Sequence, residues 1–143
     1  MEHFIKLILF SDAGNPANNI SLLVFRMLLA LQLFRAHGLG KYQDNGGKHV
    51  PNPLGLPAGL NGFIATFSET VVPFLVIIGV ATRLVVIPVI GITGIGYFVI
   101  HRNEPIRQRD ISYMYSLCFL FLFVMGAGTF SADHYLLLLY QNH

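Results

Sequence analysis

Four long apolar runs, separated by shorter polar or Gly/Pro-rich connections, dominate the pattern of this chain. Each run is about as long as the 20 or so residues that an α-helix needs to cross a bilayer. None of them alternates polar and apolar residues with a period of two, so the pattern does not support a β-barrel. The pattern predicts one all-α domain over residues 1–143, an integral membrane four-helix bundle. Its helices are expected at about 20–40, 60–81, 84–100 and 111–130.

The connections differ in character. The first, residues 41–59, contains Pro51-Asn-Pro-Leu-Gly-Leu-Pro57, which cannot continue a helix and whose apolar residues predict packing over a mouth of the bundle. The second, Thr82-Arg83, predicts a tight hairpin, at which Arg83 could cap the carbonyl groups that end the second helix. The third, residues 102–110, reads as a short charged loop.

The two ends of the chain carry short apolar segments. Residues 4–10 are expected to lie flat at the membrane interface, and residues 135–140 either do the same or extend the last helix. No basic region precedes the first segment, so a removable signal peptide is not expected. Basic residues flanking the runs favour cytoplasmic first and third connections, with both termini outside. These residues are Lys41, Lys48, Arg102, Arg107 and Arg109, against Lys6 and Arg83 on the other side.

Composition sharpens this interpretation. The 143 residues are 54% hydrophobic and only 11% charged, with a mean hydropathy of +0.61, whereas soluble domains contain about a quarter charged residues. The expected partner is therefore the lipid bilayer. A net charge of +2 is too small to suggest a nucleic-acid partner. The single cysteine, Cys118, excludes an internal disulfide or a dithiol redox pair within this chain.

Two charges interrupt the apolar runs, Arg26 in the first and Glu69 in the second. A charge at the centre of a membrane helix costs roughly 2.5–3.5 kcal/mol on insertion scales, so it usually faces a partner or a cavity. Counted from the first connection, Glu69 lies about 13 Å deep and Arg26 about 20 Å deep. An arginine side chain spans the difference, so an Arg26–Glu69 ion pair is feasible. Such a pair could serve a functional site or only fix the helix register.

Further polar residues are expected near the same end of the bundle. His37 follows Arg26 by three turns and shares its face, and His101 ends the third helix on the same side. The fourth helix adds Ser112 and Tyr115. The two histidines could converge on one pocket under the Pro-rich connection, or they could simply reach toward the membrane surface. Their spacing with Glu69 matches no metal-ligand motif, so neither a metal nor a haem site is expected.

The ordered motifs of the chain resemble the DoxX family of small bacterial membrane proteins. In the signature of that family, an Arg in the first helix is followed by His-Gly-x-x-Lys, and a helix with a Glu closes with Gly-x-x-Thr-Arg. The last helix ends in Gly-x-Gly-x-x-Ser-x-Asp. Here these are Arg26, His37-Gly-Leu-Gly-Lys41, Glu69, Gly79-Val-Ala-Thr-Arg83 and Gly126-Ala-Gly-Thr-Phe-Ser-Ala-Asp133. The resemblance implies a four-helix, multi-pass protein of the bacterial inner membrane. It also implies a link to oxidoreductases, since some relatives are subunits of thiosulfate:quinone oxidoreductase.

Three functional hypotheses follow. The first is a quinone-linked subunit acting with a soluble or membrane oxidoreductase, with no intrinsic cofactor and quinone as the candidate ligand. Its candidate pocket contains Arg26, His37, Glu69 and His101, of which Glu69 and His37 are the candidate catalytic residues. The second is a binding or transport protein for a small metabolite or lipid, and the third a non-catalytic assembly subunit. Homo-oligomerisation, and whether this chain is an enzyme, are left open.

Overall fold

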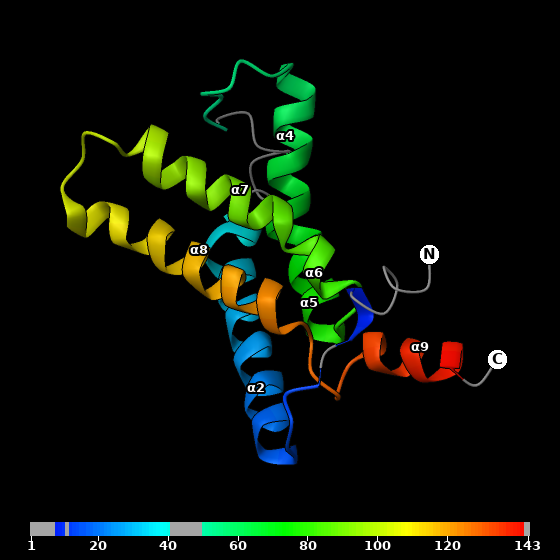
Figure 1. Ribbon diagram of the computed structural model, residues 1–143. Coiled ribbons are helices and arrows are strands. Elements are labelled where there is room, and N and C mark those ends of the chain that lie inside the picture. The colour runs from blue at the N-terminus through cyan, green and yellow to red at the C-terminus, as the bar shows by residue number, and fades with distance from the viewer. Residues whose placement is uncertain (1–7, 11, 41–49, 142–143) are drawn as a thin grey trace.

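A computed structural model describes residues 8–10, 12–40 and 50–141, and every regular element within them is helical. The predicted all-α class is therefore confirmed. The elements form two helical hairpins, and Figure 1 shows them crossing at a steep angle. The helices do not run side by side throughout, so a regular four-helix bundle is not confirmed.

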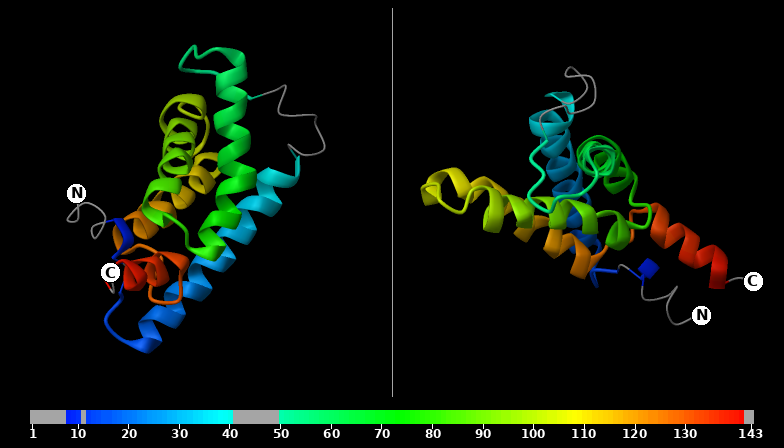
Figure 2. Two further views of the ribbon diagram at one scale, coloured as in Figure 1. Left: turned by 90° about the vertical axis from the view of Figure 1, so that its right-hand side faces the viewer. Right: turned by 90° about the horizontal axis from the view of Figure 1, so that it is seen from above.

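The first hairpin is made of two antiparallel, nearly continuous helices. One consists of α2 (Pro16–Leu33) and the π-helical segment η1 (Phe34–Gly38). The other consists of α4 (Ala58–Thr66), the π-helical segment η2 (Phe67–Val71) and α5 (Val72–Ile78). Both views show α4 projecting well beyond the end of η1 (Figures 1 and 2). The two helices are therefore offset along their axes.

The second hairpin pairs α6 (Thr82–Val85), α7 (Ile87–Ile95) and the π-helical segment η3 (Gly96–Ile100) with α8 (Ile106–Met125). A loop then leads to α9 (Ala132–Gln141), which stands beside the hairpins near the turn that joins α5 to α6 (Figure 1). The terminal apolar segment 135–140 thus belongs to a separate helix and does not extend α8. The corresponding prediction for residues 4–10 lies mostly outside the described residues.

Within the described residues, three helical stretches are long and apolar enough to cross a membrane: Pro16–Gly38, Ala58–Ile78 and Thr82–Ile100. α8 is equally long, but Arg107, Arg109 and Asp110 occupy its first turns, and it is not among the candidate spans. A fourth crossing is therefore not confirmed.

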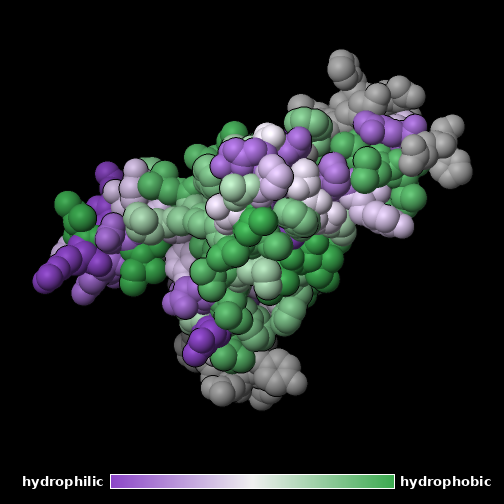
Figure 3. Space-filling view, turned by 90° about the horizontal axis from the view of Figure 1, so that it is seen from below, coloured by the Kyte–Doolittle hydropathy of each residue, from purple (hydrophilic) through white to green (hydrophobic). Residues whose placement is uncertain are grey.

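Figure 3 shows a broad hydrophobic surface over the middle of one face, with hydrophilic side chains gathered at the tip of the α7–α8 hairpin.

Local chemistry explains the helix ends. The Asn15 side chain accepts a hydrogen bond from the backbone N–H of Asn18 (2.8 Å) and caps α2. In the second helix of this hairpin, Gly79 adopts a left-handed conformation (φ 77°) that ends α5. The fourth predicted helix was wrong in its last five residues, because Gly126 and Gly128 also have positive φ and end α8 at Met125.

The core lies where the two hairpins cross, and its side chains come from both. It combines small and medium aliphatic residues with one aromatic ring, and most of these residues are almost completely buried. The cluster comprises Leu22, Ala30, Leu33, Val72, Val76, Val86, Val89, Phe119 and Leu122. Burying these groups against each other fixes the crossing point, because interiors of this kind are close-packed.

The π-helical segment η2 has a cause in the sequence. Pro73 has no N–H, and its ring would collide with the carbonyl group four residues earlier, that of Glu69. The widened turn, in which the Val72 N–H bonds to the Phe67 carbonyl, relieves this collision. There η1 approaches η2 so closely that a Cβ atom on Gly38 would collide with the Glu69 carbonyl oxygen. Pro73 and Gly38 together allow the close contact of the two segments.

We expect Gly38→Ala to lower the free energy of unfolding by about 1–3 kcal/mol, because the added methyl group overpacks this contact. Gly94→Ala is the matched control, since a Cβ at Gly94 on α7 meets no atom within 4 Å. Circular dichroism during denaturant titration in detergent measures both. Equal stability of the two variants would contradict the close approach of η1 and η2.

Candidate functional site

Arg26 is almost completely buried, with 1% of its surface exposed. Its guanidinium group donates hydrogen bonds to the backbone carbonyl groups of Ala127 and Phe130, in the loop between α8 and α9. These bonds join the first hairpin to the end of the second. The buried charge is thus surrounded by carbonyl dipoles, which offset part of the cost of removing it from water.

Asp133, also 1% exposed, ties the same loop to the turn between α5 and α6. Its carboxylate accepts hydrogen bonds from the N–H groups of Ala81 (2.6 Å) and Thr82 (3.0 Å). Its own N–H donates to the Gly79 carbonyl (2.9 Å). A Cβ atom on Gly79 would lie 2.6 Å from the Arg26 guanidinium, so glycine is required where the two charged residues meet this turn.

Two further side chains bind the backbone near this cluster. The side-chain oxygen of Asn19 accepts hydrogen bonds from the N–H groups of Thr129 (2.9 Å) and Ala13 (3.2 Å). Arg83 donates to the carbonyl of Val124 in α8 (3.0 Å), whereas the sequence suggested that it caps the second helix. We call the assembly of Asn19, Arg26, Asp133 and the backbone that they bind the polar lock.

The feasible Arg26–Glu69 ion pair was a wrong prediction. Arg26 lies at the level of Gly79, whereas Glu69 lies at the level of Gly38, ten helical residues or about 15 Å from Gly79 along the axis. The prediction placed the ends of both helices at one level, but α4 projects beyond η1 (Figures 1 and 2). The two charges therefore belong to different parts of the molecule.

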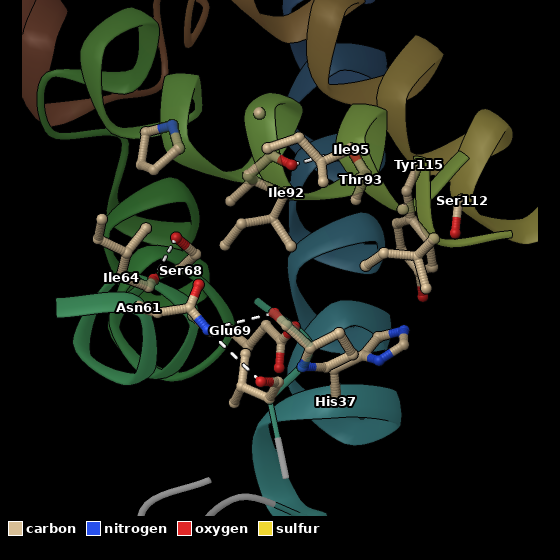
Figure 4. A pocket seen from close by; sticks show the side chains of 18 of the residues that line it. His37, Asn61, Ile64, Ser68, Glu69, Ile92, Thr93, Ile95, Ser112 and Tyr115 are labelled. Carbon is tan, nitrogen blue, oxygen red and sulfur yellow. Dashed lines mark hydrogen bonds between the residues drawn. The ribbon is translucent and has the colours of Figure 1, made fainter. Parts of the chain in front are cut away.

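A cavity of about 660 Å³ lies between the hairpins, at the end opposite the polar lock. Its lining is mostly apolar, and the described residues contribute eight polar side chains among aliphatic ones. These are His37, Asn61, Ser68, Glu69, Thr93, His101, Ser112 and Tyr115. Figure 4 shows Asn61, Ile64 and Ser68 on one side of the cavity and Tyr115 and Ser112 on the other. Both hairpins therefore contribute polar groups.

All three π-helical segments of the described chain line this cavity. His37 comes from η1, Ser68 and Glu69 come from η2, and Gly96 comes from η3. His101, the residue that follows η3, lines the cavity as well. Such segments are often found at functional sites, because the widened turn shifts side chains away from regular helical positions. One signal of this geometry is visible in the sequence, a proline four residues after Glu69.

The Pro-rich connection covers part of the cavity, as its composition predicted. Residues 50–56 supply five lining residues: Val50, Pro51, Pro53, Leu54 and Leu56. The Asn61 amide donates to the carbonyl of Pro51 (3.2 Å) and fastens this connection to α4. The residues before it, including Lys41 of the predicted motif, lie outside the described part.

The two hairpins meet across the cavity at His37 and Tyr115, whose rings are 5.8 Å apart in an edge-to-face arrangement. Among the described residues, neither the His37 ring nor the Tyr115 and Ser112 hydroxyl groups form a side-chain hydrogen bond. Thr93, by contrast, donates to the Val89 carbonyl (2.8 Å) and accepts from Ser116 (2.8 Å). The cavity therefore presents hydrogen-bonding groups from both hairpins to a ligand.

Three of the four predicted pocket residues, His37, Glu69 and His101, line this cavity, whereas Arg26 lies in the polar lock. Sequence reasoning missed Asn61, Ser68 and Thr93, which are ordinary polar residues without a distinctive spacing. Within the described residues, no group of three or more His, Cys, Asp or Glu could hold a metal ion.

Comparison with known proteins adds two findings. The family model described as DoxX matches residues 21–102, which include both halves of the first hairpin and most of the cavity lining. A protein of Haemophilus influenzae described as uncharacterized is 31% identical over 126 residues, which cover 81% of this chain and 83% of that protein. No solved structure matches the chain significantly.

We expect Asp133→Ala to destabilise the protein by about 2–5 kcal/mol, because it leaves two backbone N–H groups without their acceptor and removes the negative charge nearest Arg26. Denaturant titration in detergent measures the loss. The control is Asp110→Ala, which removes an exposed carboxylate and should change stability by less than about 0.5 kcal/mol. If both variants were equally stable, the polar lock would not hold the hairpins together.

Proposed function

The chain belongs to the DoxX family, and from this premise we propose that it is a multi-pass inner-membrane subunit that binds a quinone in the cavity between its hairpins. The protein would exchange electrons with a partner oxidoreductase. The observation that carries the proposal is the cavity itself, which presents hydrogen-bonding groups from both hairpins.

The size and lining of the cavity suit such a ligand. Small-molecule sites usually measure about 300–1,000 Å³ and are mostly apolar with a few placed polar groups, and this cavity of about 660 Å³ agrees with both criteria. Aliphatic residues such as Ile64, Ile92 and Ile95 would contact the ring and the hydrocarbon tail. Ile87 and Ile100 line the cavity and are also exposed on the apolar surface of the protein, so an apolar ligand would enter the cavity beside them.

The polar groups suit the chemistry of a quinone. A quinone ring carries two carbonyl oxygens on opposite sides, and each accepts a hydrogen bond. Tyr115 or Ser112 of α8, or the adjacent His37 of η1, would donate to one oxygen, and the Asn61 amide on the other side of the cavity would lie near the second. Glu69 also lines the cavity (Figure 4) and would exchange a proton with the reduced ring.

Electrons would come from outside the chain. Reduction of a quinone to a quinol takes up two electrons and two protons, and a single cysteine supplies neither a dithiol nor the ligands of an iron–sulfur cluster. The role of this chain is then to bind the quinone and move protons, while an oxidoreductase supplies or accepts the electrons. The first and third connections, which flank the cavity, are predicted to face the cytoplasm.

We expect the purified protein to bind a short-chain ubiquinone or menaquinone analogue saturably in isothermal titration calorimetry. Tyr115→Phe removes one hydroxyl group and should weaken binding about fivefold, the effect of one lost hydrogen bond. Glu69→Gln should reduce the proton release or uptake that accompanies quinol binding, which titrations in buffers of different ionisation enthalpy measure.

Asp110→Asn serves as the control, because it removes a carboxylate that does not line the cavity. Its affinity should equal that of the wild type. Absence of binding in the wild type would exclude the quinone. A lipid or metabolite identified by mass spectrometry in the purified protein would then favour a binding or transport role, and an empty cavity would favour an assembly subunit.

A further inference from the structure

A histidine–carboxylate pair stands at the mouth of the cavity. His101 lines the cavity, and its Nδ1 lies 2.7 Å from a carboxylate oxygen of Glu104, which does not line it. The side chains are 35% and 43% exposed, so the pair lies at the boundary between the cavity and the solvent. Nothing in the sequence motifs singles out Glu104.

The backbone holds this pair in place without help from the side chains. His101 ends η3, where its N–H donates to the Gly96 carbonyl (2.9 Å). A tight turn follows, closed by a hydrogen bond from the Glu104 N–H to the His101 carbonyl (3.0 Å). Pro105 comes next, restricts the conformation of Glu104 and precedes α8. The turn therefore sets the two side chains opposite each other.

This contact determines the protonation pattern of the ring. An ionised carboxylate only accepts hydrogen bonds, so the nitrogen that faces it must carry the hydrogen. In neutral His101 the hydrogen is then on Nδ1, and Nε2 is left with a lone pair. The same arrangement orients histidine in catalytic and metal sites, where a carboxylate fixes the tautomer and stabilises the protonated ring.

We propose that His101 is a proton-accepting residue for a hydroxyl-bearing ligand of the cavity, and that Glu104 is the positioning residue that prepares it. The inference rests on the proposed function, because it names a second group, besides Glu69, that takes one of the two protons of the quinol form. In this step the quinol O–H bond breaks and an N–H bond forms at Nε2. The ligand becomes an anion, and the imidazolium is stabilised beside Glu104. No electron moves, and the partner oxidoreductase then oxidises the quinol anion.

A merely structural role for the pair is a weaker explanation. Exposed ion pairs contribute about 0–1 kcal/mol to stability, and the turn already has its own backbone hydrogen bond. Variants at Glu104 should therefore fold, which allows the proposal to be tested directly in the complete chain.

The first test is the tautomer of His101, measured by ¹⁵N NMR on histidine-labelled protein in detergent, with its signals assigned by their loss in His101→Gln. We expect the Nδ1–H form in the wild type and in Glu104→Asp. Glu104→Ala should shift the ring to the Nε2–H form, and Asp110→Ala should leave it unchanged. An Nε2–H ring in the wild type would overturn the proposal.

The second test compares a short-chain ubiquinol with the corresponding ubiquinone by calorimetric titration. Glu104→Ala should weaken quinol binding about five- to tenfold and quinone binding less, because only the quinol donates to Nε2. Equal losses for both forms, or none, would overturn the role of His101. If the wild type bound neither form, the proposed function would fail, while the NMR result would still decide whether Glu104 positions the ring.

Discussion

A buried guanidinium group that binds backbone carbonyls is the interaction on which the rest of this structure depends. The end of a helix leaves carbonyl groups without partners, and an irregular loop in an apolar environment leaves more. Arg26 donates to two carbonyl groups of the loop after α8, and Asp133 accepts from two N–H groups at the start of α6. One arginine and one aspartate thus satisfy groups of both hairpins. The charges that would be costly alone become the means by which the hairpins are joined.

The polar lock joins the two hairpins at one end, and at the opposite end the hairpins are further apart. The side chains of the core fill the crossing point, and beyond it the cavity opens between η1, η2 and η3. Irregular helix geometry is concentrated at this end, whereas the polar lock consists of ordinary caps and a tight loop. This division has a physical basis, because a site needs groups that are not satisfied internally, and these are tolerated only where the scaffold is fixed elsewhere.

Hydropathy and turn residues were sufficient to predict the approximate positions of four long helices and the hairpin at Thr82. They offered the convergence of His37 and His101 on one pocket only as one of two alternatives. They were not sufficient to predict the offset of α4. The length of an apolar run shows which residues form the helix, but it does not show how far that helix is shifted along its axis relative to its neighbour. The long first connection places no limit on that shift. Backbone carbonyls as partners of Arg26 could not be predicted either, since they have no signature in the sequence. The loop at Gly126 and Gly128 was misread as helix because its composition is apolar.

The separation of Arg26 from Glu69 changes the meaning of the motifs. The polar lock accounts for Arg26, Gly79 and Asp133, because these residues hold the hairpins together. Their presence in a related chain therefore indicates the same fold and says nothing about the ligand. His37 and Glu69 contribute to the cavity without being needed by the lock. Function resides in sites carried by folds, and a scaffold with this division can change its ligand through cavity residues while the lock stays the same. Differences in function between DoxX proteins should therefore be sought along η1, η2 and η3, and in the turn that carries His101 and Glu104.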